Sequence, residues 1–246
     1  MKPIRERIIV AIDTPDAEEA LRLARALKGH ATHLKVGSTL FLAAGPAIVG
    51  RLRGLGFEVF VDLKLHDIPH QVAGAVRELT RLGASMVTVH ASGGSAMLAA
   101  AVDAARRDAS DLGAPRPLVV AVTVLTSLDG AALAEIGVPA RPLEQVAMLA
   151  RLAQAQGCDG VVCSPQETAE VRRLLGPDAV IVTPGVRPAW AAAGDQARVA
   201  TPSEALTWGA TFLVVGRPVT DADDPAAAFD RIVAEVTTMR YPSTRG

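Results

Sequence analysis

Acidic and basic side chains lie close together in one otherwise apolar run of the sequence, VFVDLKLHDIP. Asp62 and Lys64 stand two residues apart in this run, which on a β-strand places both side chains on the same face. A buried carboxylate and ammonium are costly unless they are paired or used, so both should point to an open end of the sheet. A structural ion pair is the simpler interpretation, but Lys35 and Asp67 bring further charges that one pair does not need. We therefore favour a chemical role for these four charged residues.

Lysine is uncommon in this chain, which makes its positions informative. Of the 25 basic residues, 21 are arginines, and the four lysines are Lys2, Lys28, Lys35 and Lys64. Arginine is the better residue for a static pair with a carboxylate, whereas only lysine can give up a proton near neutral pH. Lys35 and Lys64 are therefore predicted to have a role that arginine cannot fill.

Asp67 lies three residues beyond Lys64, so a continuing strand would aim it away from the other charges. Aspartate is a common N-cap residue, and Asp67 could cap a helix that begins near Pro69. It could instead reach a neighbouring site. The residues alone leave both interpretations open.

Two later segments, TPGVR and VVGRPV, each place a glycine and an arginine directly after an apolar run. Glycine lets backbone N–H groups approach an anion closely, and the arginine fork matches phosphate oxygens. In barrels built from alternating strands and helices, the loops after the last two strands are the usual phosphate site. The segments therefore predict that a phosphate monoester binds near Gly185, Arg187, Gly216 and Arg217.

The elements that must position these residues can be read from apolar runs of four to eight residues that alternate with segments of helical period. Amphipathic segments include Ala17 to Leu27, Val72 to Leu82 and Leu143 to Gln156, and Pro225 to Met239 closes the series. The strand-like runs are Arg7 to Ile12, His33 to Val36, Val59 to Leu63, Met86 to His90, Leu118 to Leu125, Gly160 to Cys163, Val180 to Thr183 and Phe212 to Val215.

Eight such units predict an α/β fold in which residues 1–246 form one (β/α)₈ TIM barrel, a single domain. A doubly wound open sheet is the alternative, but a glycine-rich nucleotide motif would usually follow its first strand, where this chain has AIDTPD. Residues 185–201 are long enough between elements to predict a lid over the site. The tail at 241–246 is expected to be frayed.

Composition excludes several other classes of protein. The net charge of −1 and the absence of a basic block argue against a nucleic-acid partner. No apolar run approaches the length of a membrane span or signal peptide, and Cys158 and Cys163 are too few for a disulfide framework, so we expect a cytoplasmic protein. The spacing of His66, His70 and His90 matches no compact set of metal ligands, so no metal site is predicted.

The run VFVDLKLHDIP resembles the signature of the orotidine 5'-phosphate decarboxylase family. The resemblance extends through AID, LKVG, VTVLTS, TPGVRP and VVGRPV, nearly the whole chain. It implies a homodimeric barrel that converts orotidine 5'-phosphate to uridine 5'-phosphate, the last step of de novo pyrimidine synthesis, without a metal or organic cofactor. It also implies a catalytic array of Lys35, Asp62, Lys64 and Asp67, with Asp67 contributed by the other subunit.

The same resemblance assigns the ligand contacts. It implies that Asp13 and Lys35 contact the ribose, that Thr126 and Ser127 contact the pyrimidine edge, and that Gln196, Gly216 and Arg217 grip the phosphate with Arg187 beside them. The chain departs from the family where DIPHQ replaces the common DIPNT, so His70 and Gln71 stand in place of Asn and Thr. Gln71 keeps hydrogen-bonding capacity, but its side chain is longer than that of the threonine expected to contact the ligand across the dimer.

Two other functions fit the same residues. A sugar-phosphate lyase on the same barrel also carries an Asp-x-Lys pair on its third strand, but it requires a divalent metal. A barrel that binds a phosphorylated nucleotide without catalysis would leave the lysines and carboxylates unexplained.

Overall fold

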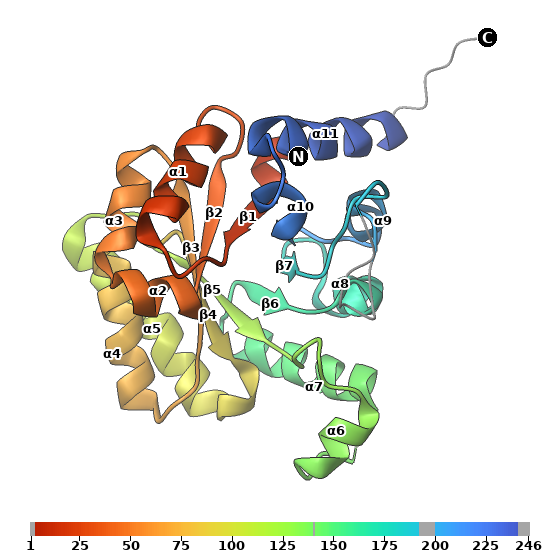
Figure 1. The fold of residues 1–246 in the computed structure, drawn as a ribbon. Helices are drawn as coiled ribbons and strands as arrows, with labels where there is room; N and C mark the ends of the chain where they lie inside the picture. Colours follow the sequence, from red (N-terminus) through yellow and green to blue (C-terminus); the bar gives the residue numbers. More distant parts are fainter. Residues whose placement is uncertain (1–2, 140, 192–199, 241–246) are drawn as a thin grey trace.

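Eight parallel strands close into one barrel in the computed structural model, which describes residues 3–139, 141–191 and 200–240 (Figure 1). The strands follow one another around the barrel in chain order, and β1 pairs with β8. This closure confirms the predicted (β/α)₈ barrel, and the open-sheet alternative is wrong. The strands are β1 (Ile8–Ile12), β2 (His33–Gly37), β3 (Glu58–Leu65), β4 (Met86–His90), β5 (Leu118–Val122), β6 (Gly160–Val162), β7 (Val180–Thr183) and β8 (Phe212–Val215).

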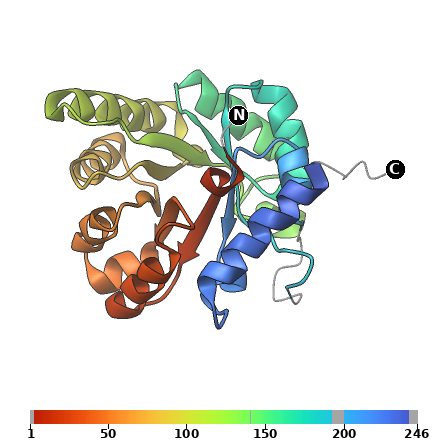
Figure 2. The same ribbon diagram turned by 90° about the horizontal axis from the view of Figure 1, so that it is seen from above.

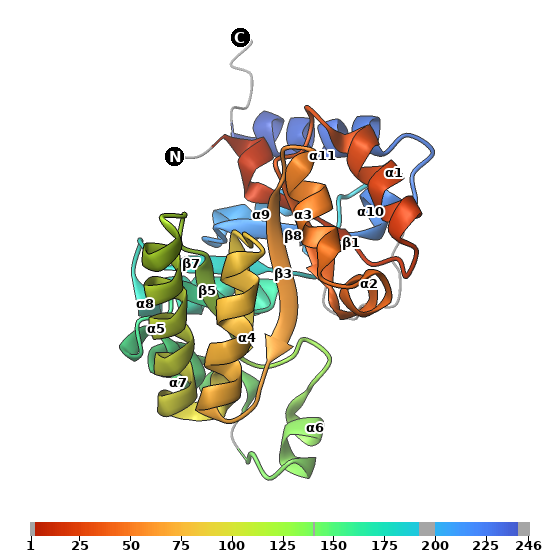
Figure 3. The same ribbon diagram turned by 90° about the vertical axis from the view of Figure 1, so that its left-hand side faces the viewer.

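Helices surround the barrel, as the view from above shows (Figure 2). The α-helices are α1 (Ala17–Leu27), α2 (Ser38–Ala44), α3 (Ala47–Gly54), α4 (Pro69–Arg81), α5 (Gly94–Leu112), α6 (Gly130–Glu135), α7 (Pro142–Ala155), α8 (Thr168–Leu175), α9 (Pro202–Thr207), α10 (Arg217–Thr220) and α11 (Pro225–Arg240). Short 3₁₀ helices are η1 (Ile4–Arg7), η2 (Ala91–Gly93) and η3 (Pro165–Glu167). Figure 3 shows α4 and α5 side by side on the outside of the barrel, while α6 projects away from it.

The helix ends follow local chemistry in the sequence. The Asp16 side chain caps α1 by accepting from the N–H groups of Glu18 and Glu19. Proline occupies the first turn of α4 and of α7, where its missing N–H costs no hydrogen bond. These signals place the helices within a few residues of their predicted bounds.

Apolar side chains form two layers of core. The larger layer lies between the strands and the surrounding helices. The smaller one fills the barrel itself, with Ile9, Phe60, Met86, Val120 and Phe212 among its buried members. Because side chains fill the barrel, a ligand cannot pass through it and can bind only at its ends.

Several strand ends differ from the predicted ones. Arg7 belongs to η1 and not to β1. Its guanidinium donates to the carbonyls of Ala210 and Thr211. β5 ends at Val122 and not at Leu125, and the Thr123 hydroxyl then bonds to the Val162 carbonyl. β3 runs on to Leu65, past its predicted end, with an irregular register against β4.

The predicted lid at 185–201 is described only at its two ends. There Val186 forms a bridge with Ala200, and the Arg187 N–H donates to the Ala200 carbonyl at 2.9 Å. Residues 192–199 lie outside the described residues, as does the tail at 241–246. The lid and the frayed tail therefore stay predictions.

Cys158 and Cys163 are both buried thiols. Burial raises the pKa of each to about 12, and the nearby carboxylates of Asp159 and Glu167 act in the same direction. Both thiols are therefore protonated at neutral pH and unreactive. In the described part of the chain, no helix is both long and apolar enough to cross a membrane.

Candidate active site

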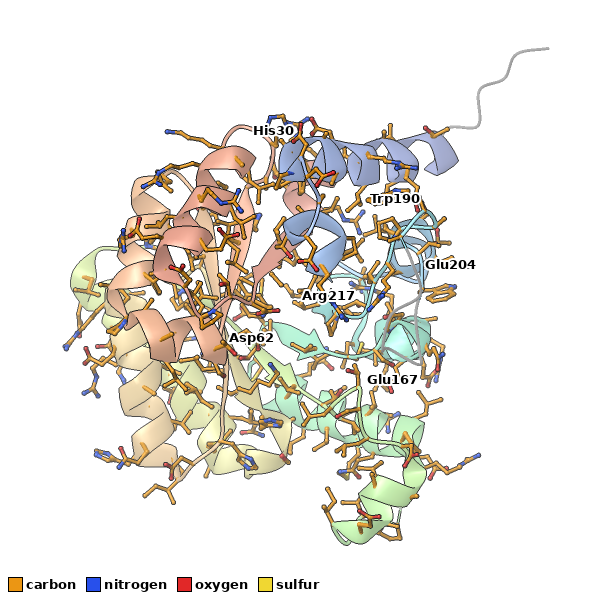
Figure 4. All side chains as sticks on the ribbon, in the orientation of Figure 1. His30, Asp62, Glu167, Trp190, Glu204 and Arg217 are labelled. Atoms are coloured by element: carbon orange, nitrogen blue, oxygen red, sulfur yellow. The ribbon has the colours of Figure 1, made fainter. Side chains whose placement is uncertain are left out.

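A cavity of about 340 Å³ opens where the strands end at the barrel mouth. Asp62 and Arg217 both line it and lie near the middle of the molecule, whereas His30 and Glu204 lie at its edge (Figure 4). The polar and glycine residues that line the cavity are Asp13, Lys35, Asp62, Lys64, Thr126, Gly185, Arg187, Gly216 and Arg217. Residues predicted separately from strands 1, 2, 3, 5, 7 and 8 therefore meet in one cavity.

A chain of alternating charges crosses the floor of this cavity. Lys35 Nζ lies 2.9 Å from Asp13 Oδ1 and 3.7 Å from Asp62 Oδ2, and Lys64 Nζ lies 2.9 Å from the same Asp62 oxygen. The Lys35 and Asp62 side chains are only 10% and 13% exposed, whereas Lys64 is 39% exposed. Asp62 and Lys64 thus form an ion pair within the cavity. Both ammonium groups line the cavity, and that of Lys64 is the more exposed to it.

Gly37 leaves the room that two of these charges need. A Cβ at this position would lie 3.0 Å from both Asp13 Oδ1 and Lys35 Nζ, closer than carbon normally approaches such atoms. Gly37, the glycine of the LKVG segment, therefore leaves the space in which the Asp13 carboxylate and the Lys35 ammonium meet. Nothing in the LKVG segment by itself indicates this role for the glycine.

The backbone of Lys64 is strained. Its φ of 51° is the one positive value found at a non-glycine position among the described residues. This left-handed conformation costs a non-glycine residue of order 1–2 kcal/mol. The register between β3 and β4 shifts over the same stretch, between Val61 and Leu65. Asp62 and Lys64 therefore meet across an irregular segment and not through the regular alternation that the sequence suggested.

Thr88, in the middle of β4, contacts both members of this pair and was not predicted from the sequence. Its hydroxyl lies 3.0 Å from Asp62 Oδ1 and accepts the Lys64 N–H at 2.8 Å. The run MVTVH gives no signal of this, because threonine is an ordinary strand residue. A role for Thr88 could be suspected only by noting that its side chain faces into the barrel on the strand next to Asp62.

Asp67 lies beyond the end of β3, is exposed and does not line the cavity. Its carboxylate accepts the N–H of Ile68 at 2.7 Å. Helix α4 begins at Pro69 with Ile68 as its N-cap residue and has no side-chain cap. The interpretation that Asp67 caps this helix is therefore wrong, and a role at a neighbouring site remains.

Two histidines lie at the same edge of the barrel. The rings of His66 and His90 are tilted by 32° to each other, with centroids 5.2 Å apart. Burial lowers the pKa of His90, and the nearby His66 and Lys64 lower it further. Among the described residues, no three His, Cys, Asp or Glu side chains are grouped in a way that could hold a metal ion.

The predicted phosphate residues lie on the opposite side of the cavity from Lys64. Gly185 and Arg187 follow β7, while Gly216 and Arg217 follow β8. Gln196 falls outside the described residues. Thr126 lines the cavity after β5, whereas its neighbour Ser127 is exposed and does not line it.

A closed (β/α)₈ barrel with lysines and carboxylates at the C-terminal ends of its strands has the architecture of a barrel enzyme. The model of the orotidine 5'-phosphate decarboxylase / HUMPS family matches residues 6–232, and the chain belongs to this family. The family resemblance noted in the sequence is thereby confirmed.

Individual relatives and solved structures agree with this membership. A protein of Paramagnetospirillum magneticum named orotidine 5'-phosphate decarboxylase is 54% identical over 229 residues, covering 93% of this chain and 97% of that protein. One of Halorhodospira halophila with the same name is 54% identical, covering 94% and 95%. The crystal structure of orotidine 5'-phosphate decarboxylase from Lactobacillus acidophilus has a TM-score of 0.84 at 38% identity, covering 94% of this chain and 99% of that one.

Proposed function

We propose that the protein decarboxylates orotidine 5'-phosphate to uridine 5'-phosphate, the last step of de novo UMP synthesis. Membership of the family and the names of the relatives support this reaction. The observation that carries it in the structure is the contact of Lys64 with Asp62 inside the cavity at the barrel mouth. A barrel that only binds a nucleotide would have no use for this costly arrangement.

Lys64 performs the central step in this proposal. When the bond between C6 and the carboxylate breaks, CO₂ leaves and the electron pair stays on C6 as a carbanion with little resonance stabilisation. The Lys64 ammonium stabilises this charge and then donates its proton to C6, which completes uridine 5'-phosphate. Lys64 afterwards regains a proton from water. Its exposure to the cavity makes it the lysine suited to this step.

Asp62 contributes less than Lys64. If the substrate carboxylate binds beside the Asp62 carboxylate, two like charges ~4 Å apart at an effective dielectric constant of ~20 repel by about 4 kcal/mol. Enzymes that face the slowest reactions lower the barrier by roughly 20 kcal/mol or more. Repulsion is therefore too small to account for catalysis. Most of the effect must come from charge stabilisation by Lys64 and from binding energy at the ribose and phosphate.

The other predicted site residues are assigned to the nucleotide, most of them from the lining of the cavity. Asp13 and Lys35 form one charged pair beside β1 and β2, and we assign them to the ribose hydroxyls. Thr126 and Ser127, after β5, are assigned to the pyrimidine edge. The phosphate is assigned to the segments after β7 and β8, with Arg187, Gln196, Gly216 and Arg217 as its contacts. Residues 185–201 would then close over the phosphate as a lid.

We further propose that two chains form a homodimer with shared sites. Asp67 is exposed in a single chain. Its neighbour Ile68 has 63% of its surface exposed. A contact with a partner subunit at this position would remove the apolar Ile68 side chain from water. The partner subunit's Asp67 would complete the charged array. His70 and Gln71 lie exposed in the first turn of α4, where Gln71 could take part in the same contact.

The reaction itself is tested by the change in ultraviolet absorbance that accompanies loss of the carboxyl group. The purified protein is expected to convert orotidine 5'-phosphate at the same rate with and without a strong divalent-metal chelator. A rate abolished by the chelator and restored by metal would favour the sugar-phosphate lyase alternative. Binding of uridine 5'-phosphate without turnover would favour the non-catalytic barrel. The cytoplasmic location stays a prediction.

Replacing Arg217 with alanine tests the phosphate assignment. We expect kcat/KM for orotidine 5'-phosphate to fall by about 10²-fold or more, because a charged hydrogen bond to phosphate is lost. Turnover of orotidine, which lacks the phosphate, should hardly change. Steady-state kinetics on the two substrates give the comparison. Equal losses on both would show that Arg217 supports the fold and does not bind phosphate.

A further inference from the structure

We propose that Thr88 is a positioning residue that fixes the Asp62–Lys64 pair in its working geometry, an inference that rests on the proposed decarboxylase function. Thr88 is 1% exposed and is not among the residues that line the cavity. It therefore touches no substrate, and its effect on the reaction must pass through its two neighbours on β3.

The hydrogen bonds of Thr88 have a single possible direction. The Lys64 N–H can only donate, so the Thr88 oxygen accepts it at 2.8 Å. The hydroxyl has one proton, and that proton is donated to Asp62 Oδ1 at 3.0 Å. Thr88 thus gives Asp62 a donor on the oxygen that faces β4. The other oxygen, Oδ2, is left turned toward Lys64 Nζ and Lys35 Nζ.

The same hydroxyl also holds the strained backbone. β3 and β4 lose their regular register between Val61 and Leu65, which is the stretch where Lys64 takes its positive φ. The Lys64 N–H finds its acceptor in the Thr88 side chain instead of a strand carbonyl. One group therefore sets both the rotation of the Asp62 carboxylate and the direction in which the Lys64 side chain leaves the strand.

Replacing Thr88 with valine tests this role, because valine keeps the branched shape and removes both hydrogen bonds. We expect kcat to fall by roughly 10- to 100-fold, since misplacement of a reacting group by about 1 Å has effects of this size. Affinity for uridine 5'-phosphate, measured by calorimetry, should change less than about threefold, because the ribose and phosphate contacts lie on other strands. Thr88→Ser, which keeps the hydroxyl, should restore most of kcat.

Thr80→Val is the matched control. Thr80 is 3% exposed, and its hydroxyl donates to the Val76 carbonyl within α4, away from the cavity. The Thr80→Val variant also loses a hydroxyl from a buried threonine, and it should keep the wild-type kcat. If Thr88→Val does not fold, kcat is compared between Thr88→Ala and Thr88→Ser, because these two variants differ in the hydroxyl alone.

The outcomes separate this inference from the function on which it rests. Wild-type kcat in Thr88→Val, or equal losses in the variants with and without the hydroxyl, would overturn the positioning role while decarboxylation stands. A fall in nucleotide affinity as large as the fall in kcat would overturn it as well, because that pattern indicates a general disturbance of the site. A wild-type protein inactive on orotidine 5'-phosphate would overturn both proposals.

Discussion

Lys64→Arg is expected to turn over orotidine 5'-phosphate almost as poorly as Lys64→Ala. Arginine keeps a positive charge next to Asp62, but its guanidinium does not give up a proton at neutral pH. Loss of a positioned general acid lowers rates by about 10²–10⁴-fold, and a displaced charge at the carbanion adds to this loss. Single-turnover assays at saturating substrate give the rate of the chemical step for both variants.

The two Lys64 variants should still bind uridine 5'-phosphate, because the proposed ribose and phosphate contacts come from other strands. Calorimetric titration with this product provides the control for folding. If Lys64→Arg keeps a substantial fraction of wild-type turnover, Lys64 acts only through its charge and the proposed proton transfer is wrong.

Mixing two inactive variants should restore activity if the sites are shared between subunits. Lys64→Ala and Asp67→Asn homodimers each lack one member of the array in every site. In a mixed dimer, one site collects both defects and the other collects neither. Random reassortment of equal amounts gives about half mixed dimers, so roughly a quarter of wild-type activity should return under twofold symmetry.

Subunit exchange must be shown separately, for example with two affinity tags and co-purification. Activity that stays at the level of the parent variants after proven exchange would place Asp67 in the site of its own chain or outside catalysis. The exposed position of Asp67 in the single chain is the structural reason to expect recovery.

The barrel and most of its mouth could be predicted from the sequence because they depend on strong, local patterns. Apolar runs spaced by amphipathic segments define the strands, and charges at their ends must face the open mouth because burial elsewhere is costly. The ends of the strands were predicted less well. Arg7 and Thr123 leave the sheet to bond distant carbonyls, and no pattern in the nearby residues records such a partner.

The finer geometry of the site depends on contacts between strands and was therefore hidden from the sequence. The positive φ of Lys64 is a conformation that the residue type disfavours, so propensity points away from it. Thr88 is a common strand residue whose role depends on which strand lies next to β4. Asp67 is the converse case, since its odd spacing was visible but the site that we propose for it belongs to a second chain.

During synthesis, β1 leaves the ribosome long before β8, the strand with which it pairs to close the barrel. An unfinished chain that stops short of Phe212 already carries Lys35, Asp62 and Lys64, but its sheet has two open edges and lacks Arg217. Open strand edges in incomplete chains invite pairing with other chains and aggregation. Docking of the last strand therefore removes the exposed edges at the same moment as it brings Arg217 to the mouth. A nascent chain therefore completes the wall of its cavity and loses its open strand edges in one step.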